Sequence, residues 1–117
     1  MPTRVEVELD IFSGMPNPTW LLVGPDAQNF ATRLAGLTRV PAQDVCGNLG
    51  YRGFIVRMVT SAQTRLIRIQ TGTVHVSEGT GTVCAKDENR ELEKWLLNTG
   101  RPHLANELVE IVERDLR

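Results

Sequence analysis

The stretch from Asp10 to Trp20 holds the densest group of side chains that could bind a ligand. Asp10 offers a carboxylate, Ser13 a hydroxyl and Asn17 an amide, while Trp20 adds an aromatic ring with an N–H donor. Polar groups of this kind orient a small polar ligand when they meet at one point, and a tryptophan ring supplies an apolar wall. We therefore predict a ligand site at this loop. The alternative is a structural loop in which Asp10 and Ser13 bind backbone donors and Trp20 lies in the core.

The backbone of this loop is expected to be stiff. Gly14 can adopt a positive φ, whereas Pro16 and Pro18 fix φ and remove two backbone donors. Each proline also restricts the residue before it to an extended conformation. The amide of Asn17 can bind its own backbone. Such a loop would hold its polar side chains in fixed positions.

A second candidate element is the glycine-rich segment 46–53, in which Tyr51 and Arg52 are the predicted ligand-binding residues. Backbone N–H groups of such loops can bind anions, and arginine can bind a carboxylate through two nitrogens. The mononucleotide and dinucleotide loops follow a strand and open a helix. This segment precedes a strand and lacks the G-K-[ST] sequence, which excludes those two classes. The GXXG pattern at 47–50 lacks the helices of RNA-binding modules. The structural alternative is a flexible connection anchored by Tyr51.

Charged residues occupy neighbouring predicted strands and nearly balance in number. We expect them to pair across the sheet, since opposite charges on adjacent strands attract; the residues are Arg52, Arg57, Arg65 and Arg68 against Glu6, Glu8 and Asp10. His75 is predicted to face solvent from a strand. An alternative function is a small cofactor-free enzyme, with Asp10 as general acid or base and Arg52 or His75 as charge stabiliser.

The histidines and cysteines are too dispersed to predict a metal site. A zinc site needs about four ligands at recognisable spacing, and His75, His103, Cys46 and Cys84 are spread over the chain without a C-x-x-C pair. We predict no metal and no cofactor. Both cysteines are expected to be reduced thiols.

Composition places the chain among globular domains of ordinary size. It has 117 residues, of which 41% are hydrophobic, and a formal net charge of −1, so we predict a single domain over residues 1–117. That charge favours neither nucleic acid nor an anionic membrane as partner. The first residues already alternate as a strand, and no apolar run reaches the length of a membrane span. The expected location is the cytoplasm.

The hydropathy pattern predicts an α+β fold. Alternation of apolar and polar residues indicates strands, and apolar residues at helical spacing indicate helices. The strands are expected at 4–12, 19–23, 54–59, 66–70, 73–77 and 82–85, and the helices at 25–37, 87–100 and 102–116. Residues 38–53 are predicted to be irregular. The expected architecture is a mainly antiparallel sheet of five or six strands, in the order ββα-ββββ-αα, with three helices packed on one face.

The function that these observations favour is a small binding or accessory protein. It would hold a small polar molecule or a peptide segment at the Asp10–Trp20 loop, because no complete catalytic constellation is visible. Besides the enzyme described above, a structural subunit of a larger assembly is the other alternative. The apolar stripe of the last predicted helix also leaves a homodimer open.

Overall fold

The computed structural model describes residues 4–12, 14–41, 52–78 and 81–116. The strands in these residues are β1 Arg4–Leu9, β2 Thr19–Leu22, β3 Thr38–Val40, β4 Phe54–Val59, β5 Thr64–Gln70, β6 Thr73–Glu78 and β7 Gly81–Lys86. The helices are α1 Pro25–Ala35, α2 Glu91–Gly100 and α3 Asn106–Leu116, with short 3-10 turns at Glu88–Arg90 and Arg101–His103.

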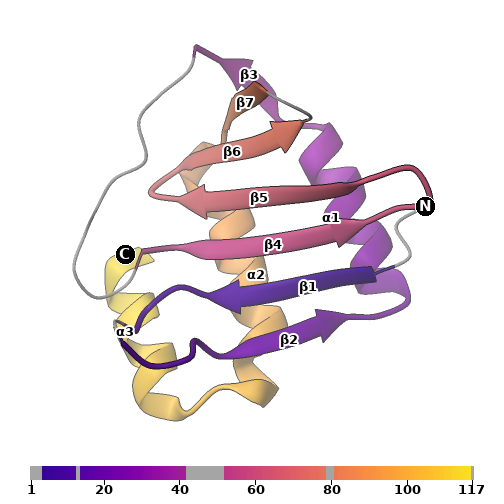
Figure 1. Ribbon diagram of the computed structural model, residues 1–117. Helices are drawn as coiled ribbons and strands as arrows, with labels where there is room; N and C mark the ends of the chain where they lie inside the picture. Colours follow the sequence, from indigo (N-terminus) through magenta and orange to yellow (C-terminus); the bar gives the residue numbers. More distant parts are fainter. Residues whose placement is uncertain (1–3, 13, 42–51, 79–80, 117) are drawn as a thin grey trace.

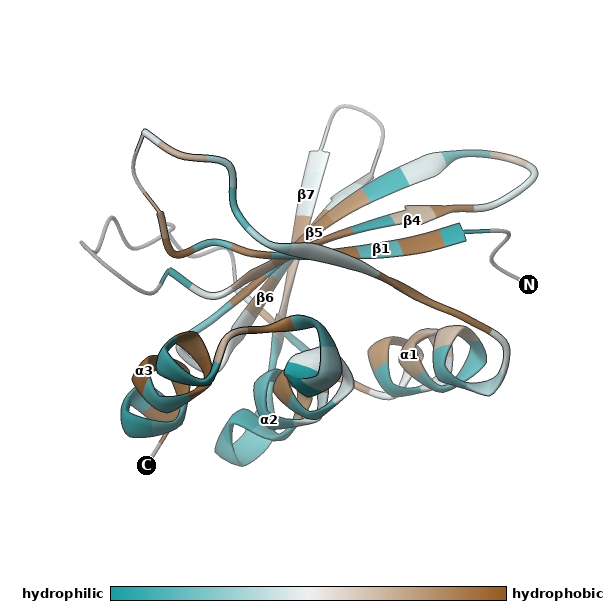
Figure 2. Cartoon of the chain, turned by 90° about the horizontal axis from the view of Figure 1, so that it is seen from below, coloured by the Kyte–Doolittle hydropathy of each residue, from teal (hydrophilic) through white to brown (hydrophobic). Residues whose placement is uncertain are grey.

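All seven of these strands join one antiparallel sheet in the order β2-β1-β4-β5-β6-β7-β3 (Figure 1). The three helices lie side by side on one face of the sheet, as Figure 2 shows. The predicted α+β class, the antiparallel pairing and the helices on one face are therefore confirmed. We call the face of the sheet without helices the open face.

The strand count differs from the prediction because β3 lies in a segment that was expected to be irregular. It has three residues and pairs with β7 at the sheet edge, Thr38 opposite Lys86 and Val40 opposite Cys84. A strand this short shows no alternation that could be recognised in the sequence. The structure therefore adds a seventh strand to the five or six predicted.

Alternation in each strand decides which side chains enter the core. Val7 lies opposite Val56 of β4, Val56 opposite Ile67 of β5, and Ile67 opposite Val76 of β6, all on the helix side. These side chains are buried. A register shift of one residue would move such a row to the open face, and each exposed side chain would lose about 1.5–3 kcal/mol of burial energy. The polar residues that alternate with these buried ones are therefore held on the open face.

The helix starts agree with the prediction only for α1, because α2 begins at Glu91 and not at residue 87, and α3 begins at Asn106 and not at residue 102. Pro25 occupies the first turn of α1, and Phe30 on its apolar side is fully buried. Gly100 is the last residue of α2 and has a φ of −88°, so it does not end the helix in a left-handed conformation. Its missing side chain instead lets Trp20 pack against it, because a Cβ at Gly100 would lie 2.5 Å from the indole ring.

Candidate functional site

Four polar residues meet on the open face where β1 ends, and we call them the Asp10 cluster: Asp10, Asn17, Arg52 and Arg68. Glu6 and Glu8 project to the open face from β1, and Asp10 continues this alternation directly after the strand. Arg68 reaches the same place from β5, and Arg52 from the residues before β4. Three segments far apart in the sequence thus contribute to one group.

The carboxylate of Asp10 is shared by two arginines. Arg52 donates from Nε at 3.2 Å and from Nη2 at 2.9 Å to Oδ1, while Arg68 donates from Nη1 to Oδ2 at 2.9 Å. Arg52 Nη2 also donates to the carbonyl oxygen of Phe12 at 2.9 Å. Asp10 is buried, whereas both arginine side chains keep more than a quarter of their surface exposed. One negative charge therefore faces two positive charges at the edge of solvent.

The side chain of Asn17 fixes the loop to β1. Its Oδ1 accepts hydrogen bonds from the backbone N–H groups of Ile11 at 3.1 Å and Phe12 at 2.8 Å. Its Nδ2 donates to Glu8 Oε2 at 2.8 Å and, at 3.4 Å, to Asp10 Oδ1. The amide was predicted to bind its own backbone, but it binds the backbone of Ile11 and Phe12 instead, and it holds the start of the loop beside the two acids.

Arg52 reaches Asp10 through an irregularity in the pairing of β1 with β4. Asp10 N–H donates to the Gly53 carbonyl at 3.0 Å, while Arg52 N–H donates to the Asp10 carbonyl at 2.8 Å, so two residues face one as in a β-bulge. Gly53 has a φ of +93°, a conformation suited to glycine. Bulges of this kind redirect side chains, and here the redirected side chain is Arg52.

The two arginines set the protonation state of Asp10. Burial by itself raises the pKa of this carboxyl, but hydrogen bonds from Arg68 and Arg52, with the attraction of both charges, outweigh it and lower the pKa below 3.8. Asp10 is therefore ionised at neutral pH and holds a proton poorly. A general acid at this position would need the opposite shift.

The Asp10→Asn variant should be less stable than the parent at pH 7 by about 1.5–3 kcal/mol, the typical value of hydrogen bonds to a charged group. The folded-state pKa of Asp10 lies below its unfolded value, so its contribution is present above about pH 4 and is lost as pH falls through the folded pKa. Urea unfolding at pH 7 and pH 2.5 should show the difference shrinking at low pH. Glu110→Gln, at an exposed position of α3, is the control. A difference independent of pH would contradict the assignment.

The structure brings together three of the six predicted site residues, Asp10, Asn17 and Arg52. Trp20 lies on the opposite face of the sheet, only 5% exposed, and its Nε1 donates to Thr99 Oγ1 of α2 at 3.1 Å. Its ring contacts Phe54 edge to face. Ser13 and Tyr51 lie outside the described residues, as does most of segment 46–53.

The predicted pairing of arginines with acids is confirmed for three of the four arginines. Arg57 Nη1 lies 2.9 Å from Glu8 Oε1 and 3.5 Å from Glu6 Oε1, and Arg52 and Arg68 pair with Asp10. The fourth, Arg65, lies opposite Met58 and therefore on the helix side. Arg68 was not among the predicted site residues. The available signal was the alternation of β5, which places Arg68 on the face that carries Asp10.

His75 was predicted to face solvent, and this is wrong. It lies on the open face opposite Arg68 on one side and Cys84 on the other, yet it is only 9% exposed. Cys84 is also buried and forms no disulfide, while Cys46 lies outside the described residues. The hydrogen bonds of Asp10 go to arginine and asparagine side chains and not to His75. The predicted alternative, in which His75 stabilises charge beside Asp10, therefore finds no support in a hydrogen bond between these two described residues.

A second polar cluster, which was not predicted from the sequence, lies where α2 begins. Glu93 has no exposed surface, and it accepts hydrogen bonds from Arg90 Nε at 3.1 Å, Arg90 Nη2 at 2.9 Å and Gly72 N–H at 2.9 Å. Arg90 also binds Asp115 of α3, donating to its carbonyl and its carboxylate at 2.7 Å each. This cluster joins the β5–β6 turn, α2 and α3.

Asp87 completes the start of α2. Its carboxylate accepts from Leu92 N–H at 2.8 Å and Glu93 N–H at 3.1 Å, so it binds backbone donors of the first turn of α2, although Arg90 stands at the N-cap position. Burial raises the pKa of Asp87, with these backbone hydrogen bonds acting in the opposite direction. Both oxygens are occupied by the helix, so the role of this buried acid is to anchor α2.

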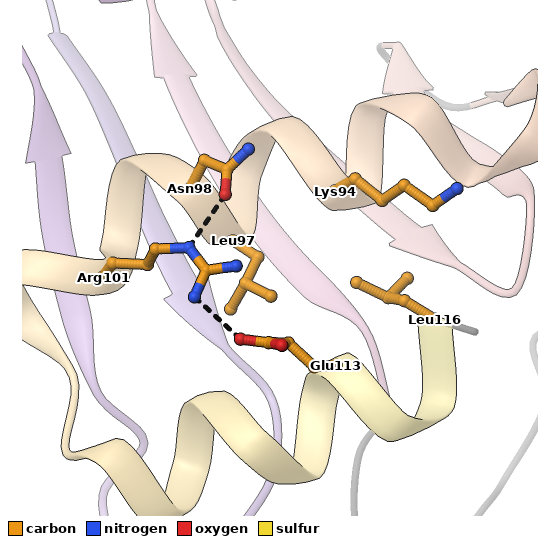
Figure 3. Close-up of a pocket in the computed structure, with 6 residues that line it drawn as sticks. All are labelled: Lys94, Leu97, Asn98, Arg101, Glu113 and Leu116. Carbon is orange, nitrogen blue, oxygen red and sulfur yellow. Dashed lines mark hydrogen bonds and ion pairs between the residues drawn. The ribbon is translucent and has the colours of Figure 1, made fainter.

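The groove between α2 and α3 forms a pocket of about 400 Å³ (Figure 3). Arg101 crosses it, donating to Asn98 Oδ1 at 2.8 Å and to Glu113 Oε1 at 2.7 Å. Leu97 and Leu116 line it as well. Its arginine is satisfied by these two partners, so this groove makes a weaker anion site than the Asp10 cluster.

Within residues 4–12, 14–41, 52–78 and 81–116, no group of three or more histidine, cysteine, aspartate or glutamate residues is arranged to hold a metal ion. Among the helices of those residues, none has the length and apolar character needed to cross a membrane. Comparison of the chain with protein-family models, curated proteins and solved structures gives no match. A function for this chain therefore has to follow from the chemistry of its own residues.

Proposed function

We propose that this protein is a small binding or accessory protein whose Asp10 cluster holds a polar ligand that carries a carboxylate. The ligand is a small organic acid, or a peptide segment that presents a carboxylate. The observation that carries the proposal is the convergence of Arg52 and Arg68 on one carboxylate at the open face of the sheet. Among these three side chains, two guanidinium groups and one carboxylate leave one positive charge in excess, while the neighbouring Glu8 is paired with Arg57.

The arginines retain donors for such a ligand. Among the described residues, Arg68 uses only Nη1, and Arg52 uses Nε and Nη2. Arg68 Nε and Nη2 and Arg52 Nη1 remain to bind a carboxylate, which accepts such donors in a fork geometry. Asp10 fixes both side chains in advance, and an ordered site loses less entropy on binding.

The contacts of both arginines with Asp10 favour a role in binding over a role in proton transfer. Asp10 is ionised, and both of its oxygens already accept arginine donors. A carboxylate held in this way is a weak base and does not serve as an acid at neutral pH. Its role in our proposal is to position the arginines.

The Arg68→Gln variant should bind succinate about tenfold more weakly than the parent, the loss expected for one charge-assisted hydrogen bond. Titration of labelled protein with succinate, and with succinamide as the uncharged analogue, would be followed by amide chemical shifts around Asp10. Arg57→Gln is the matched control, because it removes the same charge from the same face but from the pair with Glu6 and Glu8.

Only a specific effect supports the proposal. Binding of succinate but not succinamide, weakened by Arg68→Gln and retained by Arg57→Gln, is the expected result. If Arg68→Gln and Arg57→Gln lost equal affinity for succinate, the binding would be explained by general charge attraction. Undiminished binding by Arg68→Gln would place the ligand elsewhere. An acidic peptide that carries an aspartate side chain should compete with succinate for the same site.

A further inference from the structure

A cleft on the helix side of the sheet is separate from the Asp10 cluster. It has a volume of about 370 Å³ and lies between α1 and the part of the sheet that includes β6, β7 and β3. Leu34 and Leu37 line it from the helix, and Met58 and Val76 line it from the strands. Volumes above about 300 Å³ are typical of sites for small molecules.

The cleft combines these apolar walls with positive charge. Arg39 of β3 and Arg65 of β5 both line it, whereas no aspartate or glutamate is among the described residues that do so. Arg39 is exposed, and its side chain makes no hydrogen bond or ion pair with any residue that the structure describes. A ligand complementary to this cleft therefore needs an aliphatic part and an anionic head.

We propose that this cleft binds a linear aliphatic carboxylic acid, with its chain against Leu34, Leu37 and Met58 and its carboxylate at Arg39. The aliphatic chain removes apolar surface of the cleft from water. The carboxylate accepts hydrogen bonds from the guanidinium group, a charge-assisted interaction. Met58 and Val76 lie on the helix side and Asp10 on the open face, so the two sites are independent.

Two methionines report on the two sites separately. Met58 lines the cleft, whereas Met15 is 59% exposed in the loop that follows Asp10 and Phe12. With the protein labelled in its methionine methyl groups, titration with decanoate below its micelle concentration should shift the Met58 signal and leave that of Met15 in place. Saturation at one site would give the dissociation constant. Decanol serves as the uncharged analogue.

The Arg39→Gln variant should bind decanoate about tenfold more weakly and decanol unchanged, since one charged partner of the carboxylate is lost. The charge-matched control is Arg114→Gln, at an exposed position of α3 outside the cleft, which should bind as the parent does. Ala35→Phe, at an exposed position that lines the cleft, should block both ligands. These substitutions are at the surface, so folding is expected to be retained.

The outcomes separate this proposal from the one on the Asp10 cluster. A decanoate-dependent shift of Met58 that is lost in Ala35→Phe and weakened in Arg39→Gln supports it. Absence of a Met58 shift, retained binding in Ala35→Phe, or equal binding of decanoate by the parent and Arg39→Gln would overturn it. The Arg68→Gln variant should bind decanoate normally, and a loss there would place decanoate at the Asp10 cluster instead.

Discussion

Replacing Arg90 with methionine should lower the free energy of unfolding by about 3–5 kcal/mol, the cost of leaving a buried charge without its partner. Glu93 is 0% exposed, and Arg90 donates to both of its carboxylate oxygens. The hydrogen bond to Glu93 raises the pKa of Arg90 further above its ordinary value, so the arginine is charged at any pH at which the protein is folded. Methionine keeps the aliphatic part of the side chain but removes the charge. Urea unfolding monitored by tryptophan fluorescence would measure the loss.

A second substitution tests whether the buried charge causes the loss. Glu93→Gln in the Arg90→Met background should recover part of the stability, because the amide oxygen can still accept from Gly72 N–H while the uncompensated charge is gone. If the double variant lost as much stability as the sum of the losses of Arg90→Met alone and Glu93→Gln alone, this explanation would be contradicted. It would show that Arg90 acts through its packing or through Asp115 instead.

The control for this experiment is Arg101→Met, which removes the same kind of side chain from an exposed pair. Arg101 and Glu113 also connect α2 with α3, but their side chains are 45% and 38% exposed. Solvent screens such pairs, and the expected loss is below about 1 kcal/mol. Similar losses for the two variants would contradict the view that burial, and not the number of ion pairs between the helices, decides the stability.

The position of Glu93 was readable from helical spacing. Glu93, Leu96, Leu97 and Gly100 follow the i, i+3, i+4, i+7 pattern of one helix face, and all four are buried. A charged residue within an apolar stripe indicates a buried partner. Its partner could not be found in this way, because Arg90 approaches in a left-handed conformation with a φ of +57° that no sequence pattern signals.

The sequence predicts the two faces of β1 well and those of β2 poorly, for a physical reason. In β1, valine and glutamate alternate, so only one assignment of faces buries the apolar residues. In β2, Trp20, Leu21 and Leu22 follow one another, and either face could be apolar. The structure turns Trp20 to the helices and leaves Leu21 47% exposed, which separates Trp20 from the Asp10 cluster.

The Asp10 cluster itself was only partly predictable. Asp10 and Asn17 belong to one loop, and proximity in sequence is sufficient to associate them. Arg68 is 58 residues away from Asp10, and its contact depends on the strand order β1-β4-β5, which alternation alone does not determine. Arg52 depends in addition on the bulge at Gly53. Long-range pairing thus decides which residues complete the site.

Substituting Gly53 with alanine should destabilise the protein by about 3 kcal/mol or more, through two separate effects. The φ of +93° at this position strains any L-residue, at a cost of about 1–3 kcal/mol. A Cβ would also collide with the carbonyl oxygen of Ile69 and would lie 3.0 Å from Cα and Cβ of Gln70. Backbone atoms of a central strand cannot move aside freely, and overpacking of this kind costs about 1–3 kcal/mol more.

Gly14→Ala separates strain from collision. Gly14 has a comparable φ of +83°, but a Cβ there would have no heavy atom of the described residues within 4 Å. The loss of stability in Gly14→Ala should therefore be limited to the backbone strain of about 1–3 kcal/mol, which is smaller than the loss expected for Gly53→Ala. Chemical denaturation of both variants under one set of conditions would give the comparison. Equal losses would show that the close approach of β4 to β5 at Gly53 is unimportant.

The consequence for the site follows from the position of Gly53 next to Arg52. If alanine forces the bulge to relax, Arg52 N–H no longer pairs with the Asp10 carbonyl and the guanidinium moves away from the carboxylate. The Asp10→Asn substitution should then cost less in the Gly53→Ala background than in the parent, since one of its two arginine partners is already displaced. An unchanged cost of Asp10→Asn would mean that Arg52 holds its position without the bulge. In that case Gly53 would serve only the packing of β4 on β5, and the geometry of the Asp10 cluster would depend on Asp10 and Arg68.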